Sequence, residues 1–243
     1  MTEPLTGTFE VWSGTTLLGQ VTAHPQDGSA DTLALSSTEE ITLRPVMETM
    51  PEERVKSVLA TIMASGHFST LEHASYTFAV DGVSRALTHQ LVRHRLASYN
   101  QQSQRYVKFK NGISVVKPET VAASPETEAV FDEAVAACEA AYQKLLDAGI
   151  PAEDARYLLP NACESKIVIT MNVRELLHFF SLRCCNRAQW EIRDLAHRML
   201  ELARPTAPFI FADAGAGCVR GACPEGKMSC GKAQQVRRSF KSL

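Results

Sequence analysis

A polar segment between residues 93 and 106 has the composition of a binding site for a charged, planar ligand. It begins with Arg93-His94-Arg95 and ends with Arg105-Tyr106. Residues 98–104 between them carry hydroxyls and amides with no apolar period. Amides and hydroxyls can bind the edges of a heterocycle, and guanidinium groups bind phosphate through paired hydrogen bonds. We therefore predict a polar anion as the ligand, and the alternative is a surface turn capped by Ser and Asn.

The distribution of charge supports an anion site. The chain of 243 residues has a net charge of −2, but residues 82–118 contain seven Lys and Arg residues and no Asp or Glu. A solvated basic helix would normally interleave acidic residues for i,i+4 pairing. Positive charge concentrated in one segment of an acidic chain favours a defined anion site over a broad face for polyanions.

The elements that must position this segment follow from apolar periodicity. Leucines at helical spacing predict a helix over 83–97, which would place Gln90, Arg93 and His94 on one face. The other predicted elements are helices over 51–65, 124–147, 151–159, 173–184 and 188–204, strands over 76–80, 113–116 and 166–171, and short strand-like runs within 8–23 and 31–44. This mixture predicts one α/β domain over residues 1–212, followed by a flexible Cys-, Gly- and Lys-rich tail over 213–243.

The overall composition excludes several classes of protein. Apolar residues make up 45% of the chain and charged residues 21%, unlike disordered or collagen-like chains. No run of 18 apolar residues predicts a transmembrane helix, and the first residues lack the basic and apolar regions of a signal peptide. The seven cysteines are odd in number and scattered, which favours reduced thiols in a cytoplasmic protein.

The polar segment also resembles the signature of a known enzyme family. Its pattern Arg-His-Arg-x-x-Ser-x-Asn-x-x-Ser-x-Arg-Tyr is similar to the signature of the flavin-dependent thymidylate synthases. Further matches follow in the family's order: Gly-His-x-Ser-x-x-Glu-His at 66–73, Asn-x-Arg at 172–174, and Leu-Arg followed by Ala-Gln-Trp-Glu-Ile between 182 and 192. The resemblance covers roughly residues 40–212.

This resemblance implies an enzyme that converts dUMP to dTMP without a cysteine nucleophile. Methylenetetrahydrofolate would supply the carbon, and FAD reduced by NADPH would supply the hydride. The implied assembly is a homotetramer that acts on small molecules, with no nucleic-acid or membrane partner. The implied fold has long helices on a mostly antiparallel sheet and is not a Rossmann fold, which agrees with the absence of a Gly-x-Gly-x-x-Gly loop from the sequence.

The resemblance also implies roles for individual residues. Arg183 is the implied catalytic group, because a planar, permanently charged guanidinium can stabilise the uracil anion formed when N3 loses its proton. The residue alone is equally consistent with an arginine that interacts with a helix C-terminus. The implied dUMP-binding residues are Gln90, Leu91, Val92, Arg93, Gln101, Gln102, Ser103, Gln104, Arg105, Arg156 and Arg183. The implied FAD-binding residues are Ser69, Glu72, Arg93, His94, Arg95, Gln101, Asn172, Val173, Arg174 and His178.

Three other interpretations use some of the same residues. A metal hydrolase could use the histidines between 67 and 94, although no His-Glu-x-x-His is present. A nucleic-acid-binding module could use the basic segment with Tyr99, Tyr106 and Phe109, although the rest of the chain is acidic. Cys218, Cys223 and Cys230 could bind zinc, but their spacing lacks a Cys-x2-Cys pair, so we expect incidental thiols and no metal.

Overall fold

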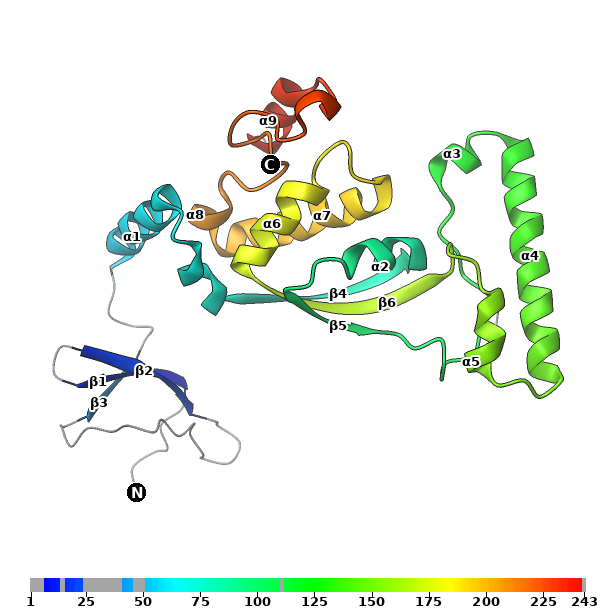
Figure 1. The fold of residues 1–243 in the computed structure, drawn as a ribbon, viewed down its shortest axis with the longest axis horizontal. Coiled ribbons are helices and arrows are strands. Elements are labelled where there is room, and N and C mark those ends of the chain that lie inside the picture. Colours follow the sequence, from blue (N-terminus) through cyan, green and yellow to red (C-terminus); the bar gives the residue numbers. More distant parts are fainter. Residues whose placement is uncertain (1–6, 14–15, 24–40, 46–50, 110–111, 242–243) are drawn as a thin grey trace. The chain divides into compact units, whose positions relative to one another are not determined.

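The computed structural model describes residues 7–13, 16–23, 41–45, 51–109 and 112–241. Backbone contacts divide the chain into two compact units, residues 1–61 and 62–243, and each is described by itself. The first unit contains strands β1 (Gly7–Ser13), β2 (Thr16–Ala23) and β3 (Ile41–Pro45), which form an antiparallel sheet in the order β2-β1-β3 (Figure 1). These strands agree with the strand-like runs predicted within 8–23 and 31–44, of which residues 31–40 lie outside the described part.

Helix α1 (Glu52–Ser65) confirms the helix predicted over 51–65. The carbonyl of Pro51 accepts hydrogen bonds from the backbone N–H groups of Arg54 and Val55, so the proline precedes the first helical turn. Gly66 follows with a φ of +69°, a left-handed conformation that glycine adopts at low cost. The short helix η1 (Phe68–His73) then leads into the second sheet.

The second unit is built on a three-stranded antiparallel sheet. Strands β4 (Ser75–Ser84), β6 (Glu164–Asn172) and β5 (Ala97–Gln101) pair in the order β4-β6-β5. Along β6 the side chains of Ser165, Ile167, Ile169 and Met171 are buried, whereas those of Lys166 and Val168 between them are exposed. This alternation means that one face of the sheet carries the core. The predicted antiparallel sheet is confirmed.

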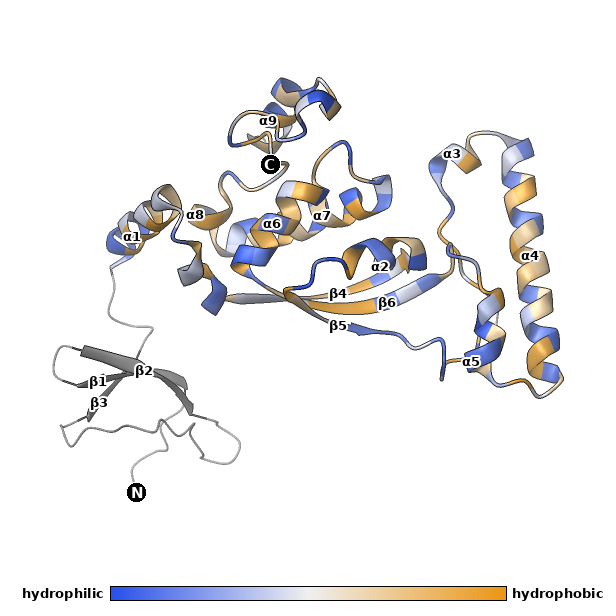
Figure 2. Cartoon of the chain, in the orientation of Figure 1, coloured by the Kyte–Doolittle hydropathy of each residue, from blue (hydrophilic) through white to orange (hydrophobic). Residues whose placement is uncertain are grey.

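Three helices cover that core face: α2 (Arg85–Leu91), α6 (Val173–Arg183) and α7 (Trp190–Ala203) (Figures 1 and 2). Leu87 of α2, Phe179 and Phe180 of α6, and Ile192 of α7 are fully buried between them. In Figure 2 these layers are rich in hydrophobic residues, whereas β5 and the connection that enters it are hydrophilic. This connection and β5 together form most of the polar segment, residues 93–106.

The helix predicted over 83–97 is wrong in its extent. Helix α2 ends at Leu91, and strand β5 begins at Ala97. Leu91 and Leu87 are buried as predicted, but Leu96 is exposed. The leucine spacing predicted a continued helix because it carries no information on pairing with β6, where Ala97 lies opposite Met171. Gln90 therefore lies on α2, whereas Arg93 and His94 lie in the connection that follows it, so the three residues are not on one helix face.

A long, largely helical segment connects β5 to β6. It contains α3 (Glu119–Ala122), α4 (Pro125–Asp147), α5 (Ala152–Ala155) and η2 (Arg156–Leu158). Ser124 caps α4, as its sequence position before Pro125 predicts, and its Oγ accepts from the N–H of Glu126 at 3.2 Å. The helix predicted over 151–159 is present as the two short pieces α5 and η2. The strand predicted over 113–116 is a single bridge, between Val115 and Cys163.

The C-terminal part of the chain contains η3 (Arg204–Thr206), α8 (Pro208–Phe211), η4 (Gly226–Met228) and α9 (Ala233–Lys241). Phe240 of α9 is buried, and the Arg204 guanidinium donates to its carbonyl at 3.1 Å and to that of Ala214 at 3.3 Å. Gly215 allows this approach, because a Cβ there would lie 2.6 Å from the Phe240 ring. The division of the chain at residues 212 and 213 stays a prediction.

Candidate active site

Helix α6 carries residues of the predicted site at both of its ends. Asn172 caps its N-terminus, where the side-chain Oδ1 accepts a hydrogen bond of 2.9 Å from the N–H of Glu175. Arg174 and His178 are exposed along the first half of the helix, and Arg183 is its last residue. One rigid element therefore positions residues predicted for FAD and the residue predicted for catalysis.

Buried His94 lies between a carboxylate and a guanidinium. Its Nδ1 is 3.0 Å from Oε1 of Glu175, and its Nε2 accepts a hydrogen bond of 3.0 Å from Nε of Arg183. Burial lowers the pKa of His94, and the charges of Arg183 and His178 act in the same direction, against the opposing effect of Glu175. The imidazole is thus held in its neutral form.

Tyr99 on β5 fixes the turn that carries His94. Its hydroxyl lies 2.8 Å from the carbonyl oxygen of His94 and 2.8 Å from that of Leu91. Burial raises the pKa of Tyr99 to about 12, and Glu175 adds to this effect. The phenol therefore keeps its proton and donates a hydrogen bond to the backbone carbonyls at and just after the end of α2.

The Arg183 guanidinium is a charge without a carboxylate partner among the described residues. Its Nη2 lies 3.4 Å from the carbonyl oxygen of Gln90, at the end of α2. Burial lowers the pKa of Arg183 below its ordinary value, and the nearby charge of Arg93 lowers it further. Arginine remains charged at neutral pH despite such shifts. A half-buried, unpaired cation of this kind can stabilise an anion on a bound ligand.

Several residues predicted for FAD are exposed on η1, on the first half of α6 and in the connection after α2. The guanidinium of Arg174 donates to the carboxylate of Glu72 on η1 at 2.5 Å, across 102 positions of sequence. Ser69 is exposed on the same short helix, and Arg93 and Arg95 are exposed after α2. These exposed cations can bind a diphosphate.

The residues predicted for the dUMP phosphate gather at α5. Arg105 forms an ion pair with Glu153, and Nε of Arg156 donates to the backbone carbonyl of Glu153 at 3.0 Å. The Ser103 hydroxyl accepts from the backbone N–H groups of Arg105 at 3.1 Å and Tyr106 at 3.4 Å, which closes a tight turn. The structure therefore brings Arg105 and Arg156 to one place, although they are 51 positions apart in the sequence.

Other predicted site residues point into the protein. The side chains of Leu91 and Val173 are fully buried, so only their backbone atoms are able to reach a ligand. The amide of Gln101 donates to the hydroxyls of Thr88 at 3.0 Å and Ser165 at 3.1 Å beneath the sheet. The side-chain amide of Gln104 lies 3.7 Å from the Cys163 sulfur. Two further predicted residues differ from these: Val92 is exposed and Gln102 is half-buried.

The sequence did not point to Glu175 or Glu153, and it pointed to Tyr99 only as part of the nucleic-acid-binding interpretation. Each holds a predicted residue in place: Glu175 binds His94, Tyr99 fixes the turn that carries His94, and Glu153 pairs with Arg105. A signal for Glu175 was present, since it is a carboxylate between the otherwise apolar core positions of α6. Glu153 lies in the acidic first turn of a short helix, where such residues are common and carry no signal.

The thiols of Cys163 and Cys184 are buried. Burial raises the pKa of Cys184 to about 12 and raises that of Cys163. Both thiols are therefore protonated at neutral pH and poor nucleophiles.

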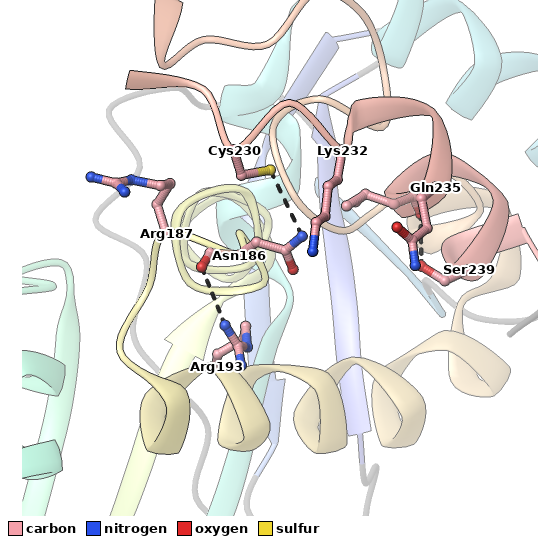
Figure 3. Close-up of a pocket in the computed structure, with 8 residues that line it drawn as sticks. Asn186, Arg187, Arg193, Cys230, Lys232, Gln235 and Ser239 are labelled. Atoms are coloured by element: carbon pink, nitrogen blue, oxygen red, sulfur yellow. Dashed lines mark hydrogen bonds between the residues drawn. The ribbon is translucent and has the colours of Figure 1, made fainter. Parts of the chain in front are cut away.

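A cavity of about 560 Å³ lies between the α6–α7 connection and the C-terminal tail (Figure 3). Asn186 Nδ2 lies 3.8 Å from the sulfur of Cys230, and the Arg193 guanidinium donates to the carbonyl of Asn186 at 3.2 Å. These contacts attach the tail just beyond Arg183. The lining contains none of the predicted site residues and consists of Asn186, Arg187, Arg193, Cys230, Lys232, Gln235, Val236 and Ser239.

Within the described ranges, no three His, Cys, Asp or Glu side chains are arranged to hold a metal ion. This search includes the histidines of the metal-hydrolase interpretation and the three tail cysteines. In the same part of the chain, no helix is long and apolar enough to cross a membrane.

Comparisons with known proteins agree on one family. The family model described as thymidylate synthase complementing protein (Thy1) matches residues 18–209. The flavin-dependent thymidylate synthase of Geobacter sulfurreducens is 57% identical over 197 residues, which cover 81% of this chain and 85% of the relative. Those of Clostridium tetani and Pyrococcus abyssi are each 48% identical, over 207 residues (79% of this chain, 83% of the relative) and 186 residues (73% and 76%).

Proposed function

The chain belongs to the family of flavin-dependent thymidylate synthases, and from this premise we propose which of its residues bind dUMP and FAD and activate the pyrimidine. The protein is an enzyme that converts dUMP to dTMP. Its cofactor is FAD, its reductant NADPH and its carbon donor methylenetetrahydrofolate.

We propose that Arg183 activates the uracil ring. The observation that carries this role is the half-buried guanidinium, which has no carboxylate partner among the described residues and whose Nε donates to neutral His94 at 3.0 Å. With Nε bound to His94 and Nη2 3.4 Å from the carbonyl oxygen of Gln90, the guanidinium is held in place, and its remaining N–H groups would face a planar ligand. Loss of the N3 proton leaves negative charge on the uracil, and a fixed guanidinium beside it lowers the free energy of that anion. This electrostatic activation needs no cysteine nucleophile.

The proposed dUMP phosphate site uses Arg105, Arg156 and the turn closed by Ser103. Both guanidinium groups contact Glu153, through its carboxylate or its carbonyl, so they converge on one place. A phosphate dianion binds Arg more strongly than a single carboxylate does, because it offers more charge and more acceptors. Binding of dUMP would therefore exchange the ion pair between Arg105 and Glu153 for contacts to phosphate. Gln90, Arg93 and the backbone of 91–92 and 101–104 complete the proposed site.

The proposed FAD site uses the exposed polar groups around the start of α6. Ser69, Arg93, Arg95, Arg174 and His178 are exposed, so their hydroxyl, guanidinium and imidazole groups are accessible to a diphosphate and an isoalloxazine edge, with Arg174 exchanging its ion pair with Glu72 for the ligand. When bound and reduced by NADPH, FAD would supply the hydride for the reaction. The part of this chain is to hold that cofactor and dUMP against each other. Roles for Glu72, His94, Gln101, Asn172 and Val173 in this site stay predictions.

We further propose a homotetramer that works in the cytoplasm on small molecules only. The arginines proposed for FAD lie on the exposed surface of the chain, and a dinucleotide is normally enclosed on most of its surface. Neighbouring subunits would supply that enclosure. Light scattering should give a mass about four times the 26.7 kDa of one chain, and a monomeric mass for the active enzyme would contradict the assembly.

The function is tested by product formation from purified protein. dUMP, methylenetetrahydrofolate, NADPH and FAD should together yield dTMP, identified by chromatography against the authentic nucleotide. Omission of any one component should abolish dTMP once bound flavin is removed from the protein. Formation of dTMP with FAD absent would contradict the flavin-dependent reaction.

A further inference from the structure

We propose that Glu175 and His94 act as a positioning pair that sets the orientation and the electrostatic environment of the Arg183 guanidinium. The inference rests on the proposed role of Arg183 and deepens it. Neither Glu175 nor His94 would touch the uracil; both would act through the arginine that does.

The direction of each hydrogen bond follows from the donors available. The Nε–H of Arg183 can only donate, so Nε2 of His94 must accept at their separation of 3.0 Å. A neutral imidazole that accepts at Nε2 carries its proton on Nδ1, and this N–H donates to Oε1 of Glu175 at 3.0 Å. The three side chains therefore define one tautomer and one polarity, from Arg183 through His94 to Glu175.

Each member of the pair is fixed independently. The side chains of His94 and Glu175 are only 4% and 7% exposed, so neither has room to change rotamer freely. The His94 ring packs edge-on against Phe179 at a centroid distance of 5.0 Å, and its carbonyl accepts from Tyr99. Glu175 lies in the first turn of α6 and Arg183 in the last, so His94 joins the two ends of the helix.

The charge of His94 decides whether this arrangement holds. A second proton, on Nε2, would replace the acceptor for Arg183 by a donor and place two cations in contact. The groups that face His94 are Glu175, Arg183, His178 and Tyr99. Burial and the charges of Arg183 and His178 favour the neutral ring, whereas Glu175 alone favours the cation. Glu175 thus selects the tautomer without making the ring positive.

The test compares kcat and the dUMP KM of the holoenzyme after substitution of Glu175. Glu175→Ala should lower kcat by about 10- to 100-fold, since small displacements of a reacting group cost rate on this scale. The KM for dUMP should change less than threefold, because the phosphate contacts at Arg105 are intact. Glu175→Gln keeps an acceptor for Nδ1–H, so its kcat should lie between those of Glu175→Ala and the wild type. If Glu175→Ala does not fold, the kcat of Glu175→Gln provides the test.

Two further variants separate positioning from a structural role. At position 94, glutamine can accept from Arg183 with its oxygen and donate to Glu175 with its nitrogen, whereas leucine can do neither. His94→Gln should therefore retain at least tenfold more activity than His94→Leu at equal flavin content. In an Arg183→Ala background, Glu175→Ala should cause no further loss, because its effect passes through Arg183.

The matched control is the other buried carboxylate of this unit, Glu191. It is 7% exposed and accepts from the backbone N–H and hydroxyl of Ser84 at 2.6 and 2.5 Å. Glu191→Gln should lower the melting temperature and leave kcat within about twofold of the wild type, as expected for a group that does not act in catalysis.

The outcomes distinguish this inference from the proposed function. Loss of activity in Arg183→Ala, together with full kcat in a folded, flavin-bound Glu175→Ala or Glu175→Gln, would overturn the positioning pair alone. Equal losses in Glu191→Gln and Glu175→Gln would also overturn it, because a general loss of packing would then explain both. Full activity in Arg183→Ala would overturn the role of the arginine itself, and the pair with it.

Discussion

At the scale of single residues, the enzyme relies on arginines whose partners differ in strength. Arg105 has an exposed carboxylate partner, Glu153, which a phosphate can replace. Arg183 has none among the described residues and is held by neutral His94. This difference matches two tasks, since phosphate binding tolerates a mobile cation, whereas activation of a heterocycle needs a fixed one.

Arg105→Ala should weaken dUMP binding without removing flavin. A charge-assisted hydrogen bond contributes about 1.5–3 kcal/mol, which corresponds to about 10- to 150-fold in Kd. Equilibrium titration of the holoenzyme with dUMP, followed by the flavin absorbance, measures this change. Lys108→Ala, which removes another cation of the same basic segment, is the control. An unchanged Kd in Arg105→Ala would remove Arg105 from the phosphate site.

The buried imidazole also predicts how stability depends on pH. Burial lowers the pKa of His94 in the folded state from its ordinary value of 6.5. Below pH 6.5 the unfolded chain therefore binds a proton that the folded chain does not. The stability from neutral His94 is present above that pH and is lost as the pH falls toward the lowered value. Urea midpoints between pH 5 and 7.5 should fall with acidity, less steeply in His94→Gln than in the wild type; an equal slope would contradict this.

At the scale of elements, α6 is the part of the fold that connects binding with catalysis. Its capping residue Asn172 begins it beside Arg174, and Arg183 ends it. His94 enters from the connection between α2 and β5 and contacts both ends of α6 through Glu175 and Arg183. The site therefore depends on two elements, one of which is irregular.

Asn172→Ala removes the cap of α6 and should destabilise the protein by about 1 kcal/mol, the usual effect of losing an Asn cap. The substitution leaves the backbone N–H of Glu175 without its capping acceptor, so it acts on the residue that positions His94. Thermal unfolding of the flavin-free protein measures it. Asn172→Ser, which restores a capping oxygen, should recover most of the loss; if it recovers none, the cap is not the stabilising contact.

The sequence predicted regular elements well where local signals were sufficient. The Ser-Pro start of α4, the Gly66 end of α1 and the apolar face of α6 were all readable along the chain. It failed between 92 and 101, because strand β5 has polar residues and is stabilised by pairing with β6, which lies far along the chain. The same limit applies to the site. The arginine-rich signature was visible, but Glu175 and Glu153 are defined only by contacts that folding creates.

At the scale of the whole molecule, a few buried groups join the C-terminal residues to the rest of the second unit. Phe240 is 3% exposed and packs beside Gly215, and Arg204 holds its carbonyl. The Arg237 guanidinium donates to the carbonyl of Cys218 at 2.8 Å. The contact between Asn186 and Cys230 in Figure 3 adds a link just beyond Arg183. These contacts predict that the tail supports the end of α6.

Phe240→Ala should destabilise the second unit by about 3–5 kcal/mol, as loss of a fully buried phenylalanine does. Leu202→Ala is the control, because Leu202 is 66% exposed and should change stability by less than about 0.5 kcal/mol. Denaturant unfolding of both variants measures the difference. Equal stabilities would mean that the tail contributes nothing to this unit.

The central claim, that a fixed guanidinium activates the pyrimidine, is tested most directly by the rate of dTMP formation in Arg183→Ala. The variant should keep its bound flavin and its assembly, since the proposed FAD and phosphate contacts lie elsewhere. We predict a rate at least about 100-fold below the wild type, the usual cost of removing a group that stabilises a developing anion. A rate within a few-fold of the wild type, at equal flavin content and saturating dUMP, would contradict the account.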